Sequence, residues 1–347
     1  MFTAFGASVV DIGSGAGLPG IPLAIARPAT IGAPTPPPPG GRVAPPPAAP
    51  PPSLAYRLLG SAADAEDTVQ DAFLRWQAAD PEYVEVPEAW LTKIVTNLAL
   101  DRLRSAKVRR ERAVGAWMPE PLLDGDPMLG PADTVEQRES VTLAVLTLME
   151  RLSPVERAVY VLREAFSYSH AEIAEILDIT ESASQQHAHR ARRRITAERN
   201  SRTIDRASAR RIVEAFVAAA SSGRTERLVA LLTDDATGLS DGAAGLAETL
   251  IRYSTPQRLA DAVRAGFRPS AAKRRLAGGS PSIHADVVNG CPAMLFALDD
   301  RVLGVAILEI RDDKIAGVRG IAAPHRLARL TEEWQRQEHD VPLIESW

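Results

Sequence analysis

Residues 152–195 read LSPVERAVYVLREAFSYSHAEIAEILDITESASQQHAHRARRRI and carry the clearest fold signal in the chain. The Ser-Pro-Val-Glu run at 153–156 combines an N-cap serine, a proline at the first helical position and a capping-box glutamate. The Ser-His-Ala-Glu run at 169–172 repeats the capping-box spacing. The short link 178–180 ends in Thr180, a good N-cap for the helix that follows. The stretch therefore predicts a helix-turn-helix.

The last helix of this motif has two different faces. Small and aliphatic residues at 184, 188, 191 and 195 share the side that packs on the preceding helix. Amides near the start of the polar side and arginines near its end suit the DNA major groove, where amides bind base edges and guanidiniums bind phosphates. A solvated helix with a cationic last turn is the alternative. The predicted DNA contacts are Ser182, Gln185, Gln186, His189, Arg190, Arg192 and Arg193.

Two more amphipathic helices are predicted before this motif. Apolar residues recur at three- and four-residue spacing from Ala62 to Trp76, with acidic residues on the other faces. A second helix follows Pro87, and its apolar side runs through residues 90, 91, 94, 98 and 103. Six cations follow within residues 102–112, which favours contact with phosphates. A Pro- and Gly-containing linker at 117–131 separates these helices from the helix-turn-helix.

The composition of the 347 residues excludes several classes of protein. Hydrophobic residues make up 45% and charged residues 24%, as in soluble multidomain chains. Apolar runs are too short for a membrane span, and the first basic residue is Arg27, which argues against a secretory signal. Cys291 is the single cysteine, so a disulfide framework or thiolate-rich metal site is excluded and a cytoplasmic location is expected. The net charge of −4 gives no hint of nucleic-acid binding, because averaging hides local patches.

The composition changes again after Arg202. An amphipathic helix at 212–220 is followed by apolar stretches that Asn289-Gly290, Asp299-Asp300 and Asp312-Asp313 interrupt at intervals of about ten residues. These pairs predict hairpin turns in an antiparallel sheet. The C-terminal third is therefore α+β and follows an all-helical middle.

The N-terminal part is of another kind. Residues 31–52 hold eleven of the 27 prolines, which favours an extended polyproline II linker and excludes a helix there. Residues 10–26 form a glycine-rich turn between an apolar run and a possible helix, a setting that lets a backbone approach a cofactor.

Three of these segments, in this order, resemble the extracytoplasmic-function sigma factors. Residues 60–76 resemble the region-two helix that docks on the clamp coiled coil of RNA polymerase, and residues 90–104 resemble the following segment, which melts and reads the minus-ten promoter element. Residues 152–195 are similar to region four, which reads the minus-thirty-five element. The prolines before Ser53 leave no room for the first helix of region two, so we expect an N-terminally truncated region two.

The resemblance assigns roles to residues of regions two and four. Trp90 is expected either in the core or against an unpaired base. The residues expected at the minus-ten element are Trp90, Lys93, Asn97, Asp101 and Arg104, and those expected at the polymerase are Asp64, Glu66, Asp67, Gln70 and Phe73.

Residues 10–26 resemble the first motif of the ribosomal small-subunit guanine-N7 methyltransferases, whose glycine turn meets S-adenosylmethionine. The similarity covers about 20 residues, and such a cofactor site needs a whole doubly wound sheet. We therefore expect a fragment without cofactor, the product of a gene fusion, a frameshift or a misplaced start.

The C-terminal third resembles the SnoaL-like, NTF2-like cone fold, which follows region four in a subgroup of these sigma factors. By resemblance, its regulatory contacts are expected at Asp241, Gly242, Pro324, Arg326 and Leu327. The same fold also supports cyclases and isomerases, for which Asp241 and His284 are the available general bases.

The sequence thus predicts a multidomain protein, with all-α sigma-two and helix-turn-helix sigma-four domains followed by an α+β NTF2-like cone domain. We expect a sigma factor and no enzyme, regulated by its own C-terminal domain, without metal or cofactor. RNA polymerase core and promoter DNA are the expected partners, an anti-sigma protein is left open, and membrane association is not expected. The predicted boundaries are 1–30 (methyltransferase-like fragment), 31–52 (linker), 53–116 (region two), 117–134 (linker), 135–202 (region four), 203–330 (cone domain) and 331–347 (tail).

Overall fold

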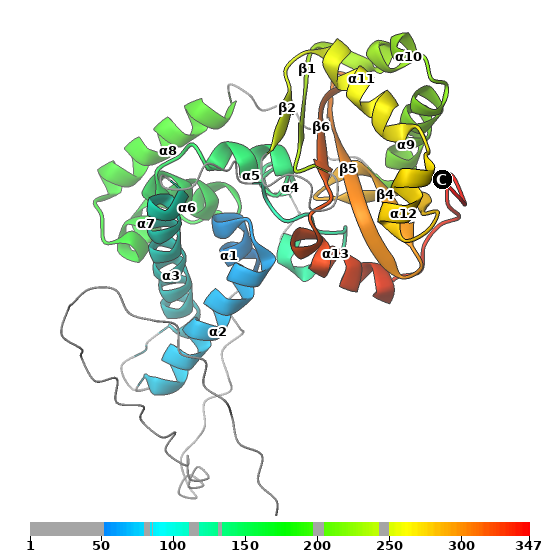
Figure 1. Ribbon diagram of the computed structural model, residues 1–347. Helices are drawn as coiled ribbons and strands as arrows, with labels where there is room; N and C mark the ends of the chain where they lie inside the picture. The colour runs from blue at the N-terminus through cyan, green and yellow to red at the C-terminus, as the bar shows by residue number, and fades with distance from the viewer. Residues whose placement is uncertain are drawn as a thin grey trace, which may run out of the picture. The chain divides into compact units, whose positions relative to one another are not determined.

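The structure is a computed structural model that describes residues 52–79, 84, 86–110, 118–130, 134–196, 205–242 and 250–347. The predicted fragment 1–30, nearly all of the proline-rich segment 31–52, Arg112, and residues 243–245 of the predicted Gly-rich loop lie outside the described residues. The described chain forms a helical part and a part built on one sheet (Figure 1).

The helical part contains two groups of helices, which match the two predicted ones. The first group contains α1 (Pro52–Leu59), α2 (Ala62–Ala78) and α3 (Pro87–Arg110). After the short helix η2 (Pro127–Leu129), the second group contains α4 (Val135–Glu139), α5 (Leu143–Met149), α6 (Pro154–Glu164), α7 (His170–Leu177) and α8 (Glu181–Thr196). Both groups share one continuous hydrophobic core.

The local signals of the helix-turn-helix are confirmed. Ser153 and Ser169 each form a reciprocal capping box with the glutamate three residues later. The link between α7 and α8 contains Asp178 in the left-handed conformation, with φ of 53°. The Thr180 hydroxyl accepts a hydrogen bond from the backbone N–H of Ala183 at 3.1 Å. These caps satisfy the free N–H groups at the start of each helix and so fix where it begins.

The predicted apolar stripe of α2 is wrong at Phe73, while Val69 packs partly buried against the core and Trp76 is half-buried. Ala62, Ala65, Thr68 and Ala72 are buried, whereas Phe73 is 42% exposed. Thr68 enters the core because its hydroxyl donates to the backbone carbonyl of Asp64 at 2.7 Å, which satisfies its polar group. Phe73 is therefore available on the surface of region two.

The C-terminal part is a six-stranded sheet with helices on both faces. Its strands are β1 (Leu232–Ser240), β2 (Ile251–Tyr253), β3 (Ser282–Val288), β4 (Cys291–Leu298), β5 (Arg301–Arg311) and β6 (Lys314–Ile321), in the spatial order β2-β1-β6-β5-β4-β3. Its helices are α9 (Arg206–Ser221), α10 (Thr225–Leu231), α11 (Pro256–Phe267), α12 (Ala271–Ala277) and α13 (Pro324–Arg336).

The three predicted hairpin turns are confirmed, but the sheet is mixed. Asn289, Asp299 and Asp312 occupy the turns with φ of 50–52°, a conformation that Asn and Asp tolerate well. β3 to β6 form an antiparallel meander. The predicted antiparallel pairing is confirmed for these strands, and β1, which the turn pattern did not include, pairs parallel to β6. Two helices and four strands separate these two strands in sequence, which leaves room for the long crossover that parallel pairing needs.

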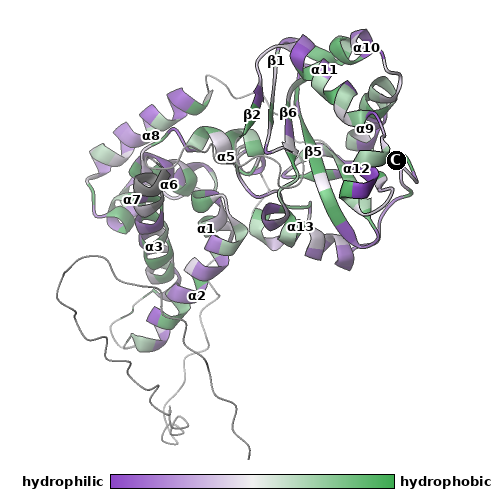
Figure 2. Ribbon diagram, viewed as in Figure 1, coloured by the Kyte–Doolittle hydropathy of each residue, from purple (hydrophilic) through white to green (hydrophobic). Residues whose placement is uncertain are grey.

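Side chains on the two faces of the sheet belong to two hydrophobic clusters. One cluster joins the sheet to α9, α10 and α11, and the other joins it to α13. Met118, Leu123 and Leu143 from the helical part belong to the second cluster. In Figure 2, β5 is mostly hydrophobic while α8 is mostly hydrophilic, in line with a central strand and a surface helix.

Candidate nucleic-acid and polymerase interface

One face of α8 is buried and the opposite face is exposed, as predicted. Ser184, Ala188, Ala191 and Ile195 are at most 3% exposed. The predicted DNA contacts are all exposed on the other side. A shallow surface hollow brings together five of them, namely Ser182, Gln185, Gln186, His189 and Arg190.

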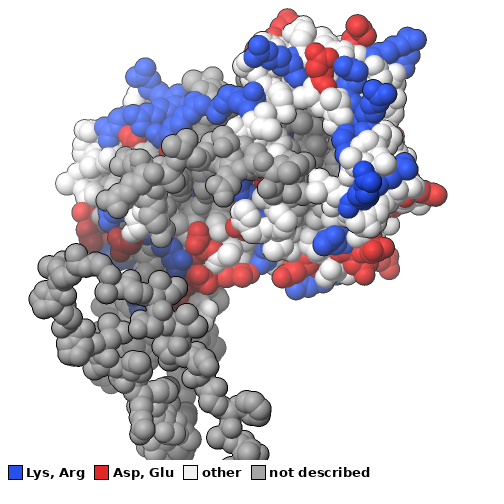
Figure 3. Space-filling model, viewed as in Figure 1, with Lys and Arg blue, Asp and Glu red and all other residues white. Residues whose placement is uncertain are grey.

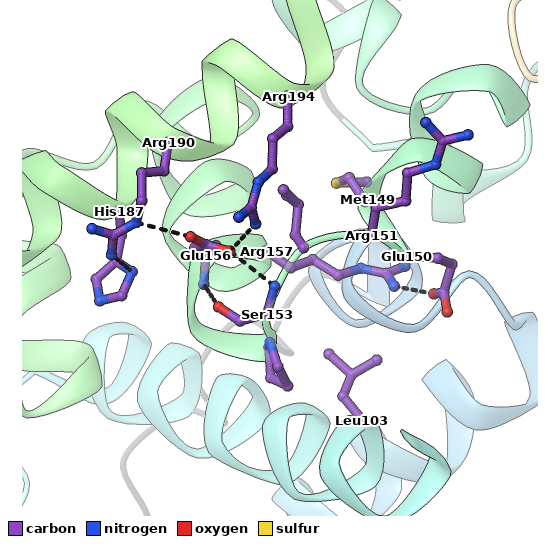
Figure 4. A pocket seen from close by; sticks show the side chains of 12 residues that line it. Leu103, Met149, Glu150, Arg151, Ser153, Glu156, Arg157, His187, Arg190 and Arg194 are labelled. Atoms are coloured by element: carbon purple, nitrogen blue, oxygen red, sulfur yellow. Dashed lines mark hydrogen bonds and ion pairs between the residues drawn. The ribbon is translucent and has the colours of Figure 1, made fainter. Parts of the chain in front are cut away.

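Glu156 of α6 fixes the last turns of α8 (Figure 4). Its carboxylate accepts hydrogen bonds from Arg190 Nε at 2.9 Å and from Arg194 Nη1 at 2.8 Å. The backbone N–H of Ser153 donates to the same carboxylate at 3.0 Å. Burial alone raises the pKa of Glu156, but the hydrogen bonds from Ser153 and Arg190 outweigh it, so the pKa lies below its ordinary value of 4.5.

A second carboxylate of α6 holds another arginine of α8. Glu164 Oε1 accepts from Arg192 Nε at 2.9 Å and from Arg192 Nη2 at 2.6 Å. The two carboxylates therefore orient Arg190, Arg192 and Arg194 along the helix. Figure 3 shows the resulting band of cationic side chains over α8.

The predicted polymerase-binding residues of α2 are exposed, and part of their charge is neutralised. Arg102 of α3 lies 3.5 Å from Asp64, 3.8 Å from Asp67 and 3.0 Å from Asp71. Gln70 and Phe73 are exposed beside them. Glu66 forms an ion pair with Arg329 of the C-terminal domain.

The predicted minus-ten residues lie along α3 in different surroundings. The Trp90 ring is half-buried and meets the Trp76 ring edge-on at a centroid distance of 5.6 Å. Lys93 Nζ donates to the Asp178 carboxylate and to the carbonyl of Glu175, both at 2.9 Å, and thus joins region two to region four. Asn97 is half-buried, and exposed Asp101 and Arg104 form an ion pair with each other at 3.1 Å.

The predicted regulatory residues gather at the start of α13, inside the C-terminal domain. The Asp241 carboxylate accepts hydrogen bonds from the backbone N–H groups of Ala322 at 2.7 Å and Ala323 at 3.2 Å, and lies 3.8 Å from Arg326. Leu327 is buried in the domain core. Pro324 starts α13, and Gly242 N–H bonds the Ser240 hydroxyl at 3.2 Å. Their regulatory role stays a prediction.

Besides the apolar contacts of Met118, Leu123 and Leu143, two polar side chains that sequence reasoning missed join the C-terminal domain to the helical part, Asn289 and Arg329. Asn289 is fully buried; its amide N–H donates to Tyr56 Oη at 2.9 Å and to the Val141 carbonyl at 2.8 Å, and its Oδ1 accepts from Leu122 N–H at 2.8 Å. Arg329 binds buried Asp126 through Nε at 2.6 Å and Nη2 at 3.0 Å. The Asn-Gly pair signals a turn, but no sequence pattern indicates its second role.

The arrangement of two helical domains, with a polar recognition helix on the second, defines a sigma-70-type transcription initiation factor. The family model for Sigma-70 region 2 matches residues 53–109, and that for Sigma-70 region 4 matches residues 142–195. The model for rRNA small subunit methyltransferase G matches residues 1–31, which lie outside the described residues.

Two similar proteins narrow the class of sigma factor to which the chain belongs. The ECF RNA polymerase sigma factor SigJ of Mycobacterium tuberculosis is 41% identical over 205 residues, which cover 58% of this chain and 65% of SigJ. The probable ECF RNA polymerase sigma factor SigI of the same species is 32% identical over 285 residues, covering 81% of this chain and 92% of SigI. The chain belongs to the ECF RNA polymerase sigma factors.

A solved structure supports the fold of most of the chain. The crystal structure of M. tuberculosis SigJ matches with a TM-score of 0.58 and 29% identity, covering 80% of this chain and 94% of that chain. The match extends well beyond regions two and four and agrees with helical domains followed by a sheet domain. Among the described helices, none has the length and apolar character needed to cross a bilayer.

Proposed function

We propose that this chain brings RNA polymerase core to specific promoters, with α8 in the major groove of the minus-thirty-five element. The observation that carries this proposal is the exposed amide face of α8, whose opposite face is fixed in the core. The exposed face of α2, which includes Phe73, is the proposed polymerase contact. Helix α3 is proposed to read the minus-ten element. Such a protein acts in the cytoplasm, and an anti-sigma protein is a further candidate partner.

The test of this proposal is the Gln186→Ala substitution. We expect the preference for the best promoter over single-base variants at one position of the minus-thirty-five element to fall by about 1–3 kcal/mol, because a side chain that reads a base edge contributes that much discrimination. Holoenzyme binding to a set of promoter variants measures the effect. Arg193→Gln is the matched control, since loss of a phosphate contact weakens all sequences alike. An unchanged ranking of the variants by Gln186→Ala would contradict the base-reading role.

We also propose that the C-terminal domain restrains the sigma domains. The contact that supports this proposal is the ion pair of Glu66, a proposed polymerase contact, with Arg329 of the C-terminal domain. A second pair, Lys93 with Asp178, holds region two against region four within the sigma domains. Both pairs must open before these side chains meet DNA or polymerase. We call the state with these pairs formed the closed arrangement. Its free energy relative to the state with the pairs open sets the fraction of protein that can bind polymerase and DNA.

The proposal includes no catalytic step. Asp241 follows β1 and His284 lies on β3, and four strand spacings of about 4.8 Å separate these strands, roughly 19 Å along the sheet. The Asp241 carboxylate accepts hydrogen bonds from the two backbone N–H groups just before α13, and the His284 ring stands edge-on to the Trp334 ring at a centroid distance of 4.9 Å. These placements argue against a shared acid–base site. For residues 1–31, the match to one glycine-rich motif gives no basis for a methyltransferase site, which needs a whole sheet.

A further inference from the structure

The surface formed by β2, α11 and α12 is strongly basic. Between residues 252 and 275 the sequence has seven cations and one anion, Asp261. Figure 3 shows Lys and Arg side chains gathered over α10, α11 and α12, with fewer acidic side chains among them. We call this surface the basic face; it consists of Arg252, Arg258, Arg264, Arg268, Lys273, Arg274 and Arg275.

Most charges of the basic face have no acidic partner among the described residues. Arg264 lies 3.7 Å from Asp261, while Arg252, Arg258, Arg268, Arg274 and Arg275 are exposed and take part in none of the ion pairs of the described chain. Elsewhere in the same domain several arginines are paired with carboxylates, as Arg206 is with Asp286, Arg311 with Asp235 and Arg319 with Glu309. Arg224, Arg227 and Arg301 are exposed and also stand in none of the ion pairs of the described chain, but they are not grouped in this way. Five arginines without an ion pair thus lie within residues 252–275, on or beside β2, α11 and α12.

The basic face is held in place by contacts that leave its arginines exposed. Lys273 Nζ donates to the carbonyls of Ala265, Gly266 and Arg268 at 2.6–2.8 Å, so it ties α12 to the end of α11. The Ser270 hydroxyl caps α12, and Trp347 Nε1 bonds the Phe267 carbonyl at 2.8 Å. α12 has no buried residue, so its arginines contribute nothing to a core. A surface ordered in this way loses little conformational entropy when it binds a partner.

We propose that the basic face is a second DNA-binding surface, which contacts the phosphate backbone of promoter DNA without reading sequence. Exposed guanidiniums bind phosphates well and carry no base information by themselves. The proposal rests on the proposed function, because the C-terminal domain begins within ten residues of the end of α8 and DNA bound by α8 is therefore at high effective concentration. A double-stranded polyanion fits exposed charges spread over two helices and a strand better than a small anion, which needs an enclosed site.

The experiment compares the full-length wild type with the Arg274→Gln/Arg275→Gln double variant, each assembled with RNA polymerase core. Affinity for a promoter fragment and for a scrambled fragment of equal length is measured over a range of salt concentrations. Each lost phosphate contact lowers the slope of log affinity against log salt by about 0.9. We expect a slope shallower by about 2, with the same fold loss of affinity for both fragments, because no base is read.

A matched control removes two exposed cations from the first positions of β5 and β6. The Arg301→Gln/Lys314→Gln double variant changes the net charge equally and lies outside α11 and α12. It should leave the salt slope within about 0.5 of the wild-type value. An equal effect of both double variants would overturn the proposal, because the loss would then reflect total charge.

Two more outcomes separate this inference from the proposed function. If the Arg274→Gln/Arg275→Gln variant lowered affinity for polymerase core without DNA and left DNA binding unchanged, the partner would be an acidic protein surface, and the DNA proposal would be wrong. If promoter preference disappeared on Gln186→Ala while the salt slope of Arg274→Gln/Arg275→Gln matched the wild type, the sigma-factor function would stand and the basic face would not bind DNA.

Discussion

The side chain of Asn289 lies at the tip of the β3–β4 turn and is fully buried against the helical part. Its amide bonds Leu122, Val141 and Tyr56, and its own backbone N–H donates to the Leu122 carbonyl at 2.9 Å. The Tyr56 hydroxyl, which accepts from Asn289, in turn donates a hydrogen bond to the Glu120 carbonyl at 2.8 Å. One turn residue thus links α1, the linker before η2 and the start of α5.

Asn289→Ala should lower the free energy of unfolding by about 2–4 kcal/mol, because each buried polar group left without a partner costs about 1–3 kcal/mol. Urea denaturation of the full chain measures the change. Asp312→Ala is the matched control: Asp312 occupies a turn with the same φ of 50° but is exposed. Both substitutions carry the strain of alanine in a left-handed conformation. Equal losses in the two variants would show that backbone strain, and not the interdomain bonds, explains the result.

Helices α6 and α8 are joined through Glu156, whose pKa is lowered by its hydrogen bonds and by nearby arginines. A carboxyl with a folded-state pKa below its unfolded value stabilises the protein above the unfolded pKa, and this contribution is lost as pH falls through the folded pKa. The ordinary value is 4.5, so the contribution is complete near neutral pH and fades below about pH 4.5. The α6–α8 unit should therefore be weakened by acid.

Glu156→Gln should be less stable than wild type at pH 7, and the gap should narrow as pH falls from about 5 to 3. Chemical denaturation at a series of pH values gives both curves. Glu175→Gln serves as control, because Glu175 is an exposed glutamate of α7 and no described cation pairs with its carboxylate. A gap between Glu156→Gln and wild type that stays constant over this pH range would mean that ionisation of Glu156 does not stabilise the domain.

At the level of the whole protein, Arg329 connects three segments: α2 through Glu66, the linker through Asp126, and α13 on which it lies. Hydrogen bonding to buried Asp126 raises the pKa of Arg329, so the guanidinium stays charged at physiological pH. Breaking this connection should shift the population from the closed arrangement toward the one that binds polymerase.

Arg329→Gln should increase transcription from a cognate promoter at limiting protein concentration by several-fold, because a differential affinity of 1.4 kcal/mol changes an equilibrium tenfold. Multi-round transcription with purified core measures the output, beside a chain ending near residue 202. Arg336→Gln is the control on the same helix, since Arg336 pairs with Glu332 and Glu333 of α13 itself. Unchanged output from both Arg329→Gln and the shortened chain would show that the C-terminal domain does not regulate this sigma factor.

Local sequence determined the elements and the chemistry of α8. The capping boxes at Ser153 and Ser169, the two faces of α8 and the turns at Asn289, Asp299 and Asp312 all depend on contacts within a few residues, so their patterns could be read directly. The tertiary structure decided which distant segments these helices and turns contact. Asn289 and Tyr56 are 233 residues apart, Lys93 and Asp178 are 85 apart, and β1 pairs with β6 across most of the domain. Such contacts depend on how whole surfaces fit together, and the pattern of neighbouring residues, which fixes a helix or a turn, carries no information about which distant surface will cover it.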